Sequence, residues 1–243
     1  MTTAARIASS APGFVSSASR QRMYTGVRIW SRCRFASDLR TEILPFGHGW
    51  SNPGRGIEPF LHSCRGMGSG FSVRDATARD LRRVADIKVR NWENTYSTLL
   101  EPAVLHPFLD TGVQLTEMRE RFAQPGTLLL VAEDGAGKVA GFALTFLDDE
   151  PEPWLESLHV LHEFRGSGIG TMLMRRTAQR LIAREYNSLR LGVISGNAAA
   201  ARFYERLGGE MIGLEPVSWA PGASHEIYRW EDITSLAQMQ LYD

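Results

Sequence analysis

The chain has 243 residues with a hydrophobic fraction of 43%, which suffices for one sizeable core or for a core with an extension. Its formal net charge is zero, but residues 1–69 hold nine Arg and three acidic residues, whereas residues 70–243 hold 18 basic and 24 acidic ones. The larger part is therefore acidic, which argues against nucleic acid as a partner. No apolar run approaches the roughly 20 residues that span a membrane, so we expect no membrane partner either.

The first 69 residues are rich in Ser, Gly, Pro and Arg and lack apolar periodicity, so we expect a disordered basic extension. Residues 1–37 contain six Arg and no acid, a composition that also fits an organelle transit peptide. A native start near Met67, just before the first expected strand, is a third interpretation. Both cysteines, Cys33 and Cys64, lie in this extension, which excludes thiol chemistry from the rest of the chain.

From residue 70 the pattern is that of one mixed α/β domain ending near residue 232, followed by a C-terminal tail over 233–243 with at most one short helix. Thr77 and Asp80 resemble a capping box at the start of the first helix, with Asp in place of the usual Glu or Gln. Strands are expected over 71–74, 127–132, 139–146, 154–161, 189–194, 210–218 and 224–230. Helices are expected over 81–92, 101–123, 174–182 and 197–207.

Residues 165–170 read Arg-Gly-Ser-Gly-Ile-Gly and connect an expected strand to an expected helix. Glycines at alternate positions let the backbone curl with its N–H groups inward, and the helix N-terminus adds a positive dipole, which predicts a phosphate site. A nucleoside-triphosphate loop needs Lys after the last Gly, where Thr171 and Met172 stand. A dinucleotide fingerprint needs a different glycine spacing after the first strand and an acid at the end of the next one, and the chain has neither.

The glycine turn is similar to the R/Q-x-x-G-x-G/A pyrophosphate loop of the GNAT superfamily of N-acetyltransferases. Residues 158–160, the segment 197–208 and the order of elements also match that family, and residues 92–96 (Trp-Glu-Asn-Thr-Tyr) resemble the first-helix signature of many bacterial members. The resemblance covers about residues 71–231. It implies a GNAT fold, with a mixed, mostly antiparallel sheet of six to seven strands flanked by about four helices.

The resemblance also implies acetyl-CoA as co-substrate and no metal. Backbone groups of residues 158–160 would pair with the pantetheine arm like an added strand, and amides of the glycine turn would hold the pyrophosphate. The expected cofactor-binding residues are Leu158, His159, Val160, Arg165, Gly166, Ser167, Gly168, Ile169, Gly170, Thr171 and Asn197. Asn197 would cap its helix as well as hydrogen-bond CoA.

Two side chains are expected to carry the chemistry. Tyr204 matches the family tyrosine near the CoA sulfur, where its phenol can donate a proton or a hydrogen bond to the leaving thiolate; packing alone is the alternative. Glu156 is the expected general base, with an exposed strand acid as the alternative, and the Val160 N–H would be the main donor to the acetyl carbonyl. Simple strand alternation puts Glu156, Leu158 and Val160 on one face of the sheet and His159 on the other.

Trp92 and Tyr96 are expected to line the acceptor pocket, although core packing also explains Trp92. The acidic run 148–152 would attract a cationic amine or form a solvated loop. The expected reaction is direct transfer of an acetyl group from acetyl-CoA to a primary amine of a small molecule or peptide, in the cytoplasm unless residues 1–37 are a transit peptide. The alternatives are an inactive CoA-binding sensor or scaffold, and a protein N-terminus or lysine as acceptor. A homodimer is compatible with the resemblance.

Overall fold

The structure, a computed structural model, describes residues 70–149 and 151–240. The expectations for the basic extension, the transit peptide and a start near Met67, like those for Glu150 and residues 241–243, concern residues outside this described part.

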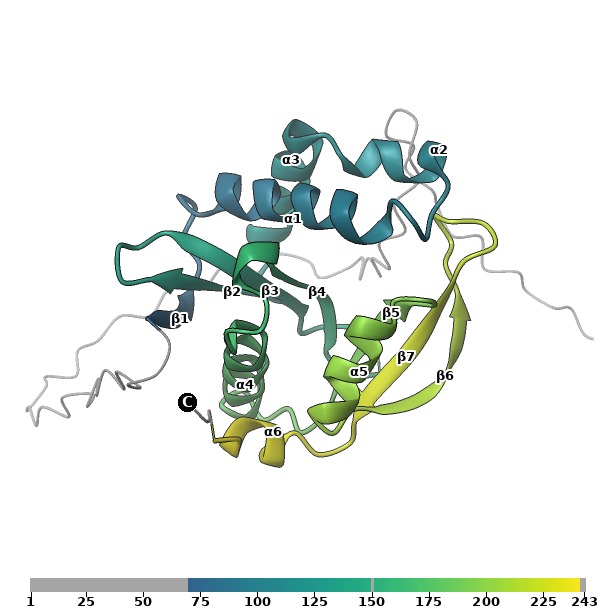
Figure 1. The fold of residues 1–243 in the computed structure, drawn as a ribbon. Helices are drawn as coiled ribbons and strands as arrows, with labels where there is room; N and C mark the ends of the chain where they lie inside the picture. Colours follow the sequence, from purple (N-terminus) through teal and green to yellow (C-terminus); the bar gives the residue numbers. More distant parts are fainter. Residues whose placement is uncertain (1–69, 150, 241–243) are drawn as a thin grey trace, which may run out of the picture.

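Seven strands form one sheet in the order β1-β2-β3-β4-β5-β7-β6 (Figure 1). They are β1 (Phe71–Asp75), β2 (Thr127–Asp134), β3 (Val139–Phe146), β4 (Trp154–Val160), β5 (Leu189–Ile194), β6 (Glu210–Pro216) and β7 (Ser224–Trp230). Neighbouring strands are antiparallel except for β4 and β5, which run parallel. The expectation of a mixed, mostly antiparallel sheet is confirmed.

The helices of the described residues are α1 (Leu81–Tyr96), α2 (Pro102–Leu105), α3 (Thr111–Phe122), α4 (Ile169–Ile182), α5 (Ala198–Arg206) and α6 (Thr234–Gln238), with 3₁₀ turns η1 (His106–Phe108) and η2 (His162–Phe164). Within this part of the chain, none of them is long and apolar enough to cross a membrane.

The expectation of one helix over residues 101–123 is wrong, because the segment divides into α2, η1 and α3. Pro107 has no backbone N–H to continue a helix. The Asp110 carboxylate then accepts hydrogen bonds from the N–H groups of Gly112 (2.7 Å) and Val113 (3.0 Å), which caps the start of α3. At the other end of the domain, α6 packs against α4 and buries Leu236, so this part of the expected tail belongs to the packed structure.

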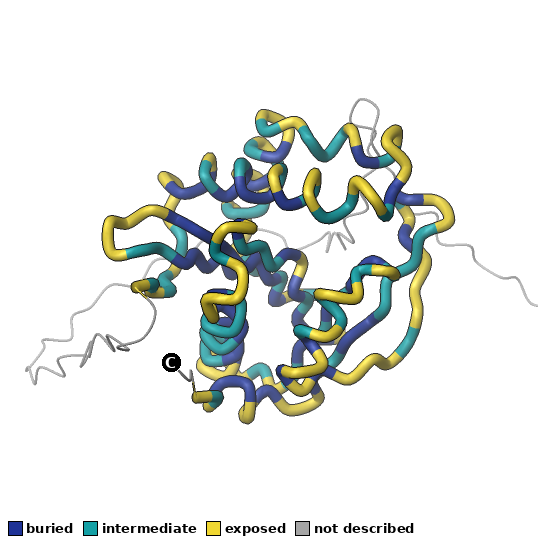
Figure 2. Tube along the Cα trace, in the orientation of Figure 1, coloured by how far each residue is buried: buried dark blue, intermediate teal, exposed yellow. Residues whose placement is uncertain are grey.

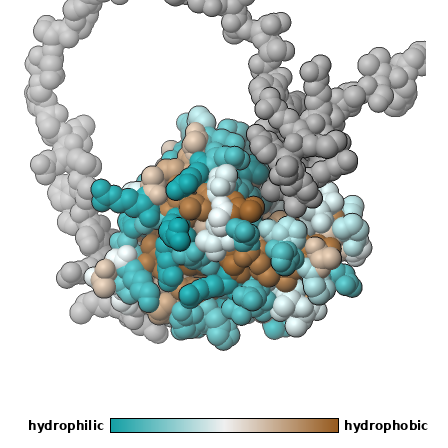
Figure 3. Space-filling model, turned by 90° about the horizontal axis from the view of Figure 1, so that it is seen from above, coloured by the Kyte–Doolittle hydropathy of each residue, from teal (hydrophilic) through white to brown (hydrophobic). Residues whose placement is uncertain are grey.

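Helices cover both faces of the sheet, with α1 and α3 above it and α4 below it in Figure 1. Each face has its own apolar core, one between the sheet and α4, α5 and α6, the other between the sheet and α1 and α3. Strands β2 and β3 are accordingly the most continuously buried segments, whereas β6 at the edge of the sheet is largely exposed (Figure 2). Seen from above, the described surface is mostly hydrophilic, with apolar residues gathered in the middle of the view (Figure 3).

A third, smaller apolar cluster joins the segment after α1 to β5 and to the β6–β7 connection. Leu100, in the turn between α1 and α2, packs with Ile194 of β5 and with Val217 and Ala220 of the β6–β7 connection. This connection therefore reaches across to the upper helices, as Figure 1 shows at the right of the view.

The start of α1 is stabilised by a buried carboxylate. The Asp80 side chain accepts hydrogen bonds from the Thr77 N–H (2.7 Å) and hydroxyl (2.9 Å), so half of the expected capping box forms. The Arg74 guanidinium from β1 also donates two bonds to Asp80 (2.8 and 3.0 Å). This hydrogen-bonded partner lowers the pKa of Asp80 from 3.8 to about 2.

Asp80→Asn is expected to lower the free energy of unfolding at pH 7 by about 1 to 2 kcal/mol, because it removes a carboxylate whose pKa is depressed in the folded state. The stabilisation is present above pH 3.8 and is lost as the pH falls toward 2. Urea unfolding of both proteins over a pH series measures it. Glu93→Gln, on the exposed side of α1, is the control, and a difference that stays constant down to pH 2 would contradict the assignment.

Candidate active site

The sheet opens between its two parallel strands. β4 and β5 pair at Trp154 and Arg190 and then separate (Figure 1). Arg190 holds this junction, since its guanidinium lies over the Trp154 ring (5.3 Å to the centroid) and 3.6 Å from the Asp149 carboxylate. Beyond the junction a cavity of about 1290 Å³ extends between the strands. It is lined by β4, β5, the glycine turn, α1, α3, α5 and the β6–β7 connection.

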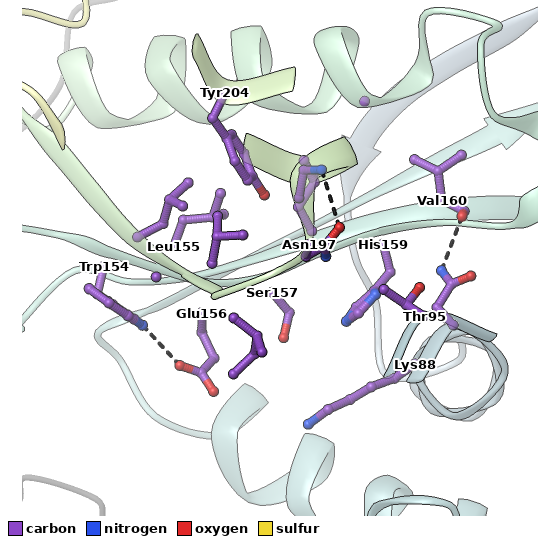
Figure 4. Close-up of a pocket in the computed structure, with 18 of the residues that line it drawn as sticks. Lys88, Thr95, Trp154, Leu155, Glu156, Ser157, His159, Val160, Asn197 and Tyr204 are labelled. Carbon is purple, nitrogen blue, oxygen red and sulfur yellow. Dashed lines mark hydrogen bonds between the residues drawn. The ribbon is translucent and has the colours of Figure 1, made fainter. Parts of the chain in front are cut away.

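A β-bulge in β4 changes which way Glu156 points. Leu155 pairs with Thr145 and Ser157 with Leu144, so Glu156 is the extra residue in the ladder. The expectation that Glu156 shares a face with Leu158 and Val160 is therefore wrong. Leu158 and Val160 pack toward the α4 core, whereas Glu156 and His159 point to the other side, where Lys88 lies (Figure 4).

The backbone of β4 presents unpaired groups to the cavity. The Leu161 N–H bonds to the Ala140 carbonyl of β3 (2.9 Å), and in an antiparallel ladder every second residue bonds to the same neighbour. His159 therefore also directs its backbone groups to β3, opposite Phe142. Leu158 directs both of its backbone groups, and Val160 its N–H, away from β3 and into the space that β5 leaves open. Of the three residues expected to pair with pantetheine, these two have suitable backbone groups.

The last carbonyl of β4 is held by two side chains. The Asn91 amide of α1 donates to the Val160 oxygen (3.1 Å) (Figure 4), and the Arg165 Nε donates to the same oxygen (3.4 Å). Arg165 further contacts the Asn91 side-chain oxygen (3.3 Å) and the Thr95 hydroxyl (3.4 Å). Arg165 thus ties the glycine turn to α1 and the end of β4. Asn91 is buried, and sequence reasoning did not single it out.

The glycine turn has the expected conformation. Gly166 and Gly168 have φ angles of +84° and +80°, in the left-handed region that favours glycine. A Cβ on Gly170 would lie 3.1 Å from the Phe203 ring, so this position is restricted by packing. The first N–H groups of α4 have no acceptor within the helix and are available to an anion. Ser167 is an exception among the expected donors, because its N–H and hydroxyl both bond to the Phe164 carbonyl (3.4 and 2.6 Å).

Three polar side chains meet where α5 faces the strands. The Asn197 oxygen accepts from the Ala200 N–H (3.2 Å), which confirms the expected cap. The Asn197 side chain also lies beside the Tyr96 hydroxyl at the end of α1. The Tyr204 hydroxyl points from α5 toward Asn197 and the strands (Figure 4). Burial raises the pKa of Tyr204 well above its usual range, so the phenol stays protonated.

The opposite side of β4 carries charged groups from α1 and α3. The Glu156 carboxylate accepts from the Trp154 indole N–H (3.0 Å), and Lys88 pairs with Glu117 (3.3 Å). The cavity leaves Glu156 accessible, but its walls shield the carboxylate from bulk water, and this desolvation raises the pKa of Glu156 above the usual value. Lys88 opposes that shift without cancelling it.

His159 shares this side of the strand but has a different character. Its imidazole packs on the Phe142 ring (5.2 Å between centroids). Burial lowers the pKa of His159 to about 3, helped by the positive charges of Lys88 and Arg165. The imidazole is therefore neutral and a weak base at physiological pH.

Aromatic rings form one end of the cavity. Trp92 lies 4.4 Å from Phe108, 5.1 Å from Tyr96 and 5.4 Å from Trp219, measured between ring centroids. All four line the cavity, so both expected acceptor-site residues, Trp92 and Tyr96, face it. Trp219 comes from the β6–β7 connection, far from Trp92 in sequence, and no local sequence pattern indicated it. Of the acidic run, Asp149 and Glu152 are paired with Arg190 and Arg229.

Among the described residues, no three His, Cys, Asp or Glu side chains gather as a metal site would require.

Comparison with known proteins identifies the family. The profile of the Acetyltransferase (GNAT) family matches residues 83–209. The L-methionine sulfoximine/L-methionine sulfone acetyltransferase of Pseudomonas paraeruginosa is 30% identical over 171 residues, which cover 67% of this chain and 91% of the relative. The chain belongs to the GNAT acetyltransferase family. It is thus an enzyme of the acyltransferase class, as the glycine turn and its flanking segments predicted.

Solved GNAT structures have the same fold. PaiA N-acetyltransferase from Thermoplasma acidophilum, in complex with coenzyme A, superposes with a TM-score of 0.54 at 18% identity and covers 65% of this chain and 97% of its own. The Salmonella typhimurium protein YncA, with its cofactor acetyl-CoA, gives a TM-score of 0.53 at 20% identity over 71% of this chain and 98% of its own.

Asn91→Ala is expected to lower the free energy of unfolding by about 1 to 3 kcal/mol, because it leaves the Val160 carbonyl and the Arg165 guanidinium each without one partner. Chemical denaturation measures the change. Asn94→Ala, at an exposed position one turn further along α1, controls for helix propensity. Equal effects of the two substitutions would contradict a specific role for Asn91.

Proposed function

We propose that this GNAT enzyme transfers an acetyl group from acetyl-CoA to a primary amine of a small molecule or peptide by direct attack. One observation carries the proposal. The backbone groups of Leu158 and the backbone N–H of Val160, which have no partner on β3 or β5, face the same cavity as the glycine turn and the free amides at the start of α4. This arrangement offers an extended chain for pairing, followed by an anion site, which is what a pantetheine arm and a pyrophosphate require.

The residues that would hold acetyl-CoA are those whose polar groups face the cavity and have no other hydrogen-bond partner among the described residues. Leu158 supplies its backbone N–H and carbonyl, Val160 supplies its N–H, and the turn from Gly166 to Thr171 supplies amides other than that of Ser167. Asn197 contributes its side chain beside Tyr204. Acetyl-CoA would supply the acetyl group as a thioester, whose sulfur leaves as a thiolate.

Three groups then have roles in the transfer. Glu156 accepts a proton from the acceptor ammonium, the Val160 N–H donates to the acetyl carbonyl oxygen, and the Tyr204 hydroxyl donates a hydrogen bond to the sulfur. A carbon–nitrogen bond forms as the carbon–sulfur bond breaks, and the sulfur keeps the electron pair. The second proton of the attacking nitrogen ends on this thiolate, so that the products are the acetylated amine and the CoA thiol. Because Tyr204 holds its proton tightly, hydrogen-bond donation suits it better than complete proton transfer.

The names of two relatives support a small acceptor. One is the L-methionine sulfoximine/L-methionine sulfone acetyltransferase. Another is the streptothricin acetyltransferase of Streptomyces lavendulae, 30% identical over 53% of this chain. The deciding experiment incubates the full chain with acetyl-CoA and a panel of amines and peptides, follows thiol release, and identifies products by mass spectrometry. Turnover without an acetylated amine product would contradict the proposal.

Tyr204→Phe keeps the ring and its packing but removes the hydroxyl. We expect kcat to fall about 10- to 100-fold, since a hydrogen bond to a developing anion is lost, with little change in the KM for acetyl-CoA. Steady-state kinetics measure both constants. Tyr186→Phe, in the connection between α4 and β5 and outside the cavity lining, is the control. An unchanged kcat in Tyr204→Phe would leave Tyr204 a packing role only.

Glu156→Gln tests the general base. Because burial raises the pKa of Glu156, kcat/KM of the wild type should fall, as the pH decreases, already above the roughly 4.3 of an unperturbed Glu. The variant should be slower and should lose this acid limb. Glu163→Gln, exposed in η2, should keep the wild-type profile, and an acid limb that persists in Glu156→Gln would assign the base elsewhere.

A further inference from the structure

Four charged side chains from α1, α3 and β4 line the acceptor side of the cavity, two cations and two carboxylates. They are Lys88, Glu117, Arg121 and Glu156. Lys88 and Glu117 are bonded to each other (3.3 Å), and their side chains are only 5% and 16% exposed. Since each largely neutralises the other, the groups left to interact with a ligand are Arg121 and Glu156.

Arg121 is held in place without using its hydrogen-bond donors. Its guanidinium lies over the Phe146 ring, 4.8 Å from the centroid. In residues 70–149 and 151–240, no protein group accepts a hydrogen bond from it, and no ion pair joins it to Glu156. Arg121 and Glu156 line the same cavity, and the charge of Arg121 favours the ionised form of Glu156.

The Arg121 guanidinium and the Glu156 carboxylate thus form a pair of opposite charges that are not bonded to each other. A planar guanidinium with unused N–H groups matches a carboxylate with two parallel hydrogen bonds. A carboxylate such as Glu156 matches an ammonium group. A ligand that carries both an ammonium and a carboxylate complements the pair better than a simple amine does, because a simple amine leaves the guanidinium unsatisfied.

We propose that the acceptor is an amino acid whose carboxylate binds Arg121 while its amine faces Glu156. This inference rests on the proposed function and adds the class of acceptor. The aromatic group of Trp92, Phe108 and Trp219 provides an apolar surface for the acceptor's side chain, as the rings line the same cavity.

The experiment compares acceptors that differ only in the carboxylate. Each of the twenty common L-amino acids is assayed with the full chain and acetyl-CoA, beside its amide and its decarboxylated amine, for example L-leucine, L-leucinamide and 3-methylbutylamine. We expect kcat/KM for the best amino acid to exceed that of its two counterparts about 10-fold or more. Arg121→Met, which keeps an apolar chain over Phe146, should lower kcat/KM for the amino acid about 10- to 100-fold and leave the decarboxylated amine within about 2-fold.

Two matched variants separate charge from structure. Arg121→Lys keeps the charge and should retain part of the preference, whereas Arg119→Met, at an exposed position on the same helix, should behave like wild type. An enzyme that acetylates the amines or amides as well as the amino acids, or an Arg121→Met variant that slows all three alike, would overturn the inference while leaving amine acetylation intact. Absence of turnover with every acceptor would instead contradict the proposed function, and the inference with it.

Discussion

The separation of β4 from β5 is the constraint on which the site depends. Buried backbone N–H and C=O groups are normally paired, and here Leu158 presents both of its groups, and Val160 its N–H, to an open cavity. Water can satisfy these groups while the cavity is open, so the arrangement costs little in the absence of a ligand. The junction at Trp154 and Arg190 fixes where the opening begins. The glycine turn follows at the far end of β4, so one strand connects both parts of the proposed cofactor site.

The same strand separates two chemical environments. On the α4 side, Leu158 and Val160 contribute to the main core and Tyr204 approaches from α5. On the α1 side, Glu156 and His159 face the charged and aromatic side chains of α1 and α3. The bulge at Glu156 produces this division, because regular alternation would have turned the carboxylate toward the apolar core. An ionised Glu there would lack partners and be strongly disfavoured.

Local patterns in the sequence predicted the elements that depend on local physics. The strands, the glycine turn and the Asn197 cap are of this kind, since each depends on backbone conformation or on contacts a few residues apart. The bulge was missed because an extra residue is defined only relative to the partner strand. Asn91, Arg121 and Trp219 were missed because their roles depend on Val160, Phe146 and Trp92, which are distant in sequence. The break at Pro107 and the cap at Asp110 were also missed, but for these two the local sequence contained the necessary signal.

Burial has opposite effects on the two titratable groups that β4 turns toward the acceptor side. It disfavours charge, so it raises the pKa of Glu156 and lowers that of His159. The nearby cations act differently on the two, because they stabilise the Glu156 carboxylate but repel a proton on His159. The outcome is a carboxylate with increased basicity beside an imidazole that has lost most of its own. A proton leaving the acceptor amine on this side of β4 therefore has Glu156 as the stronger of the two bases.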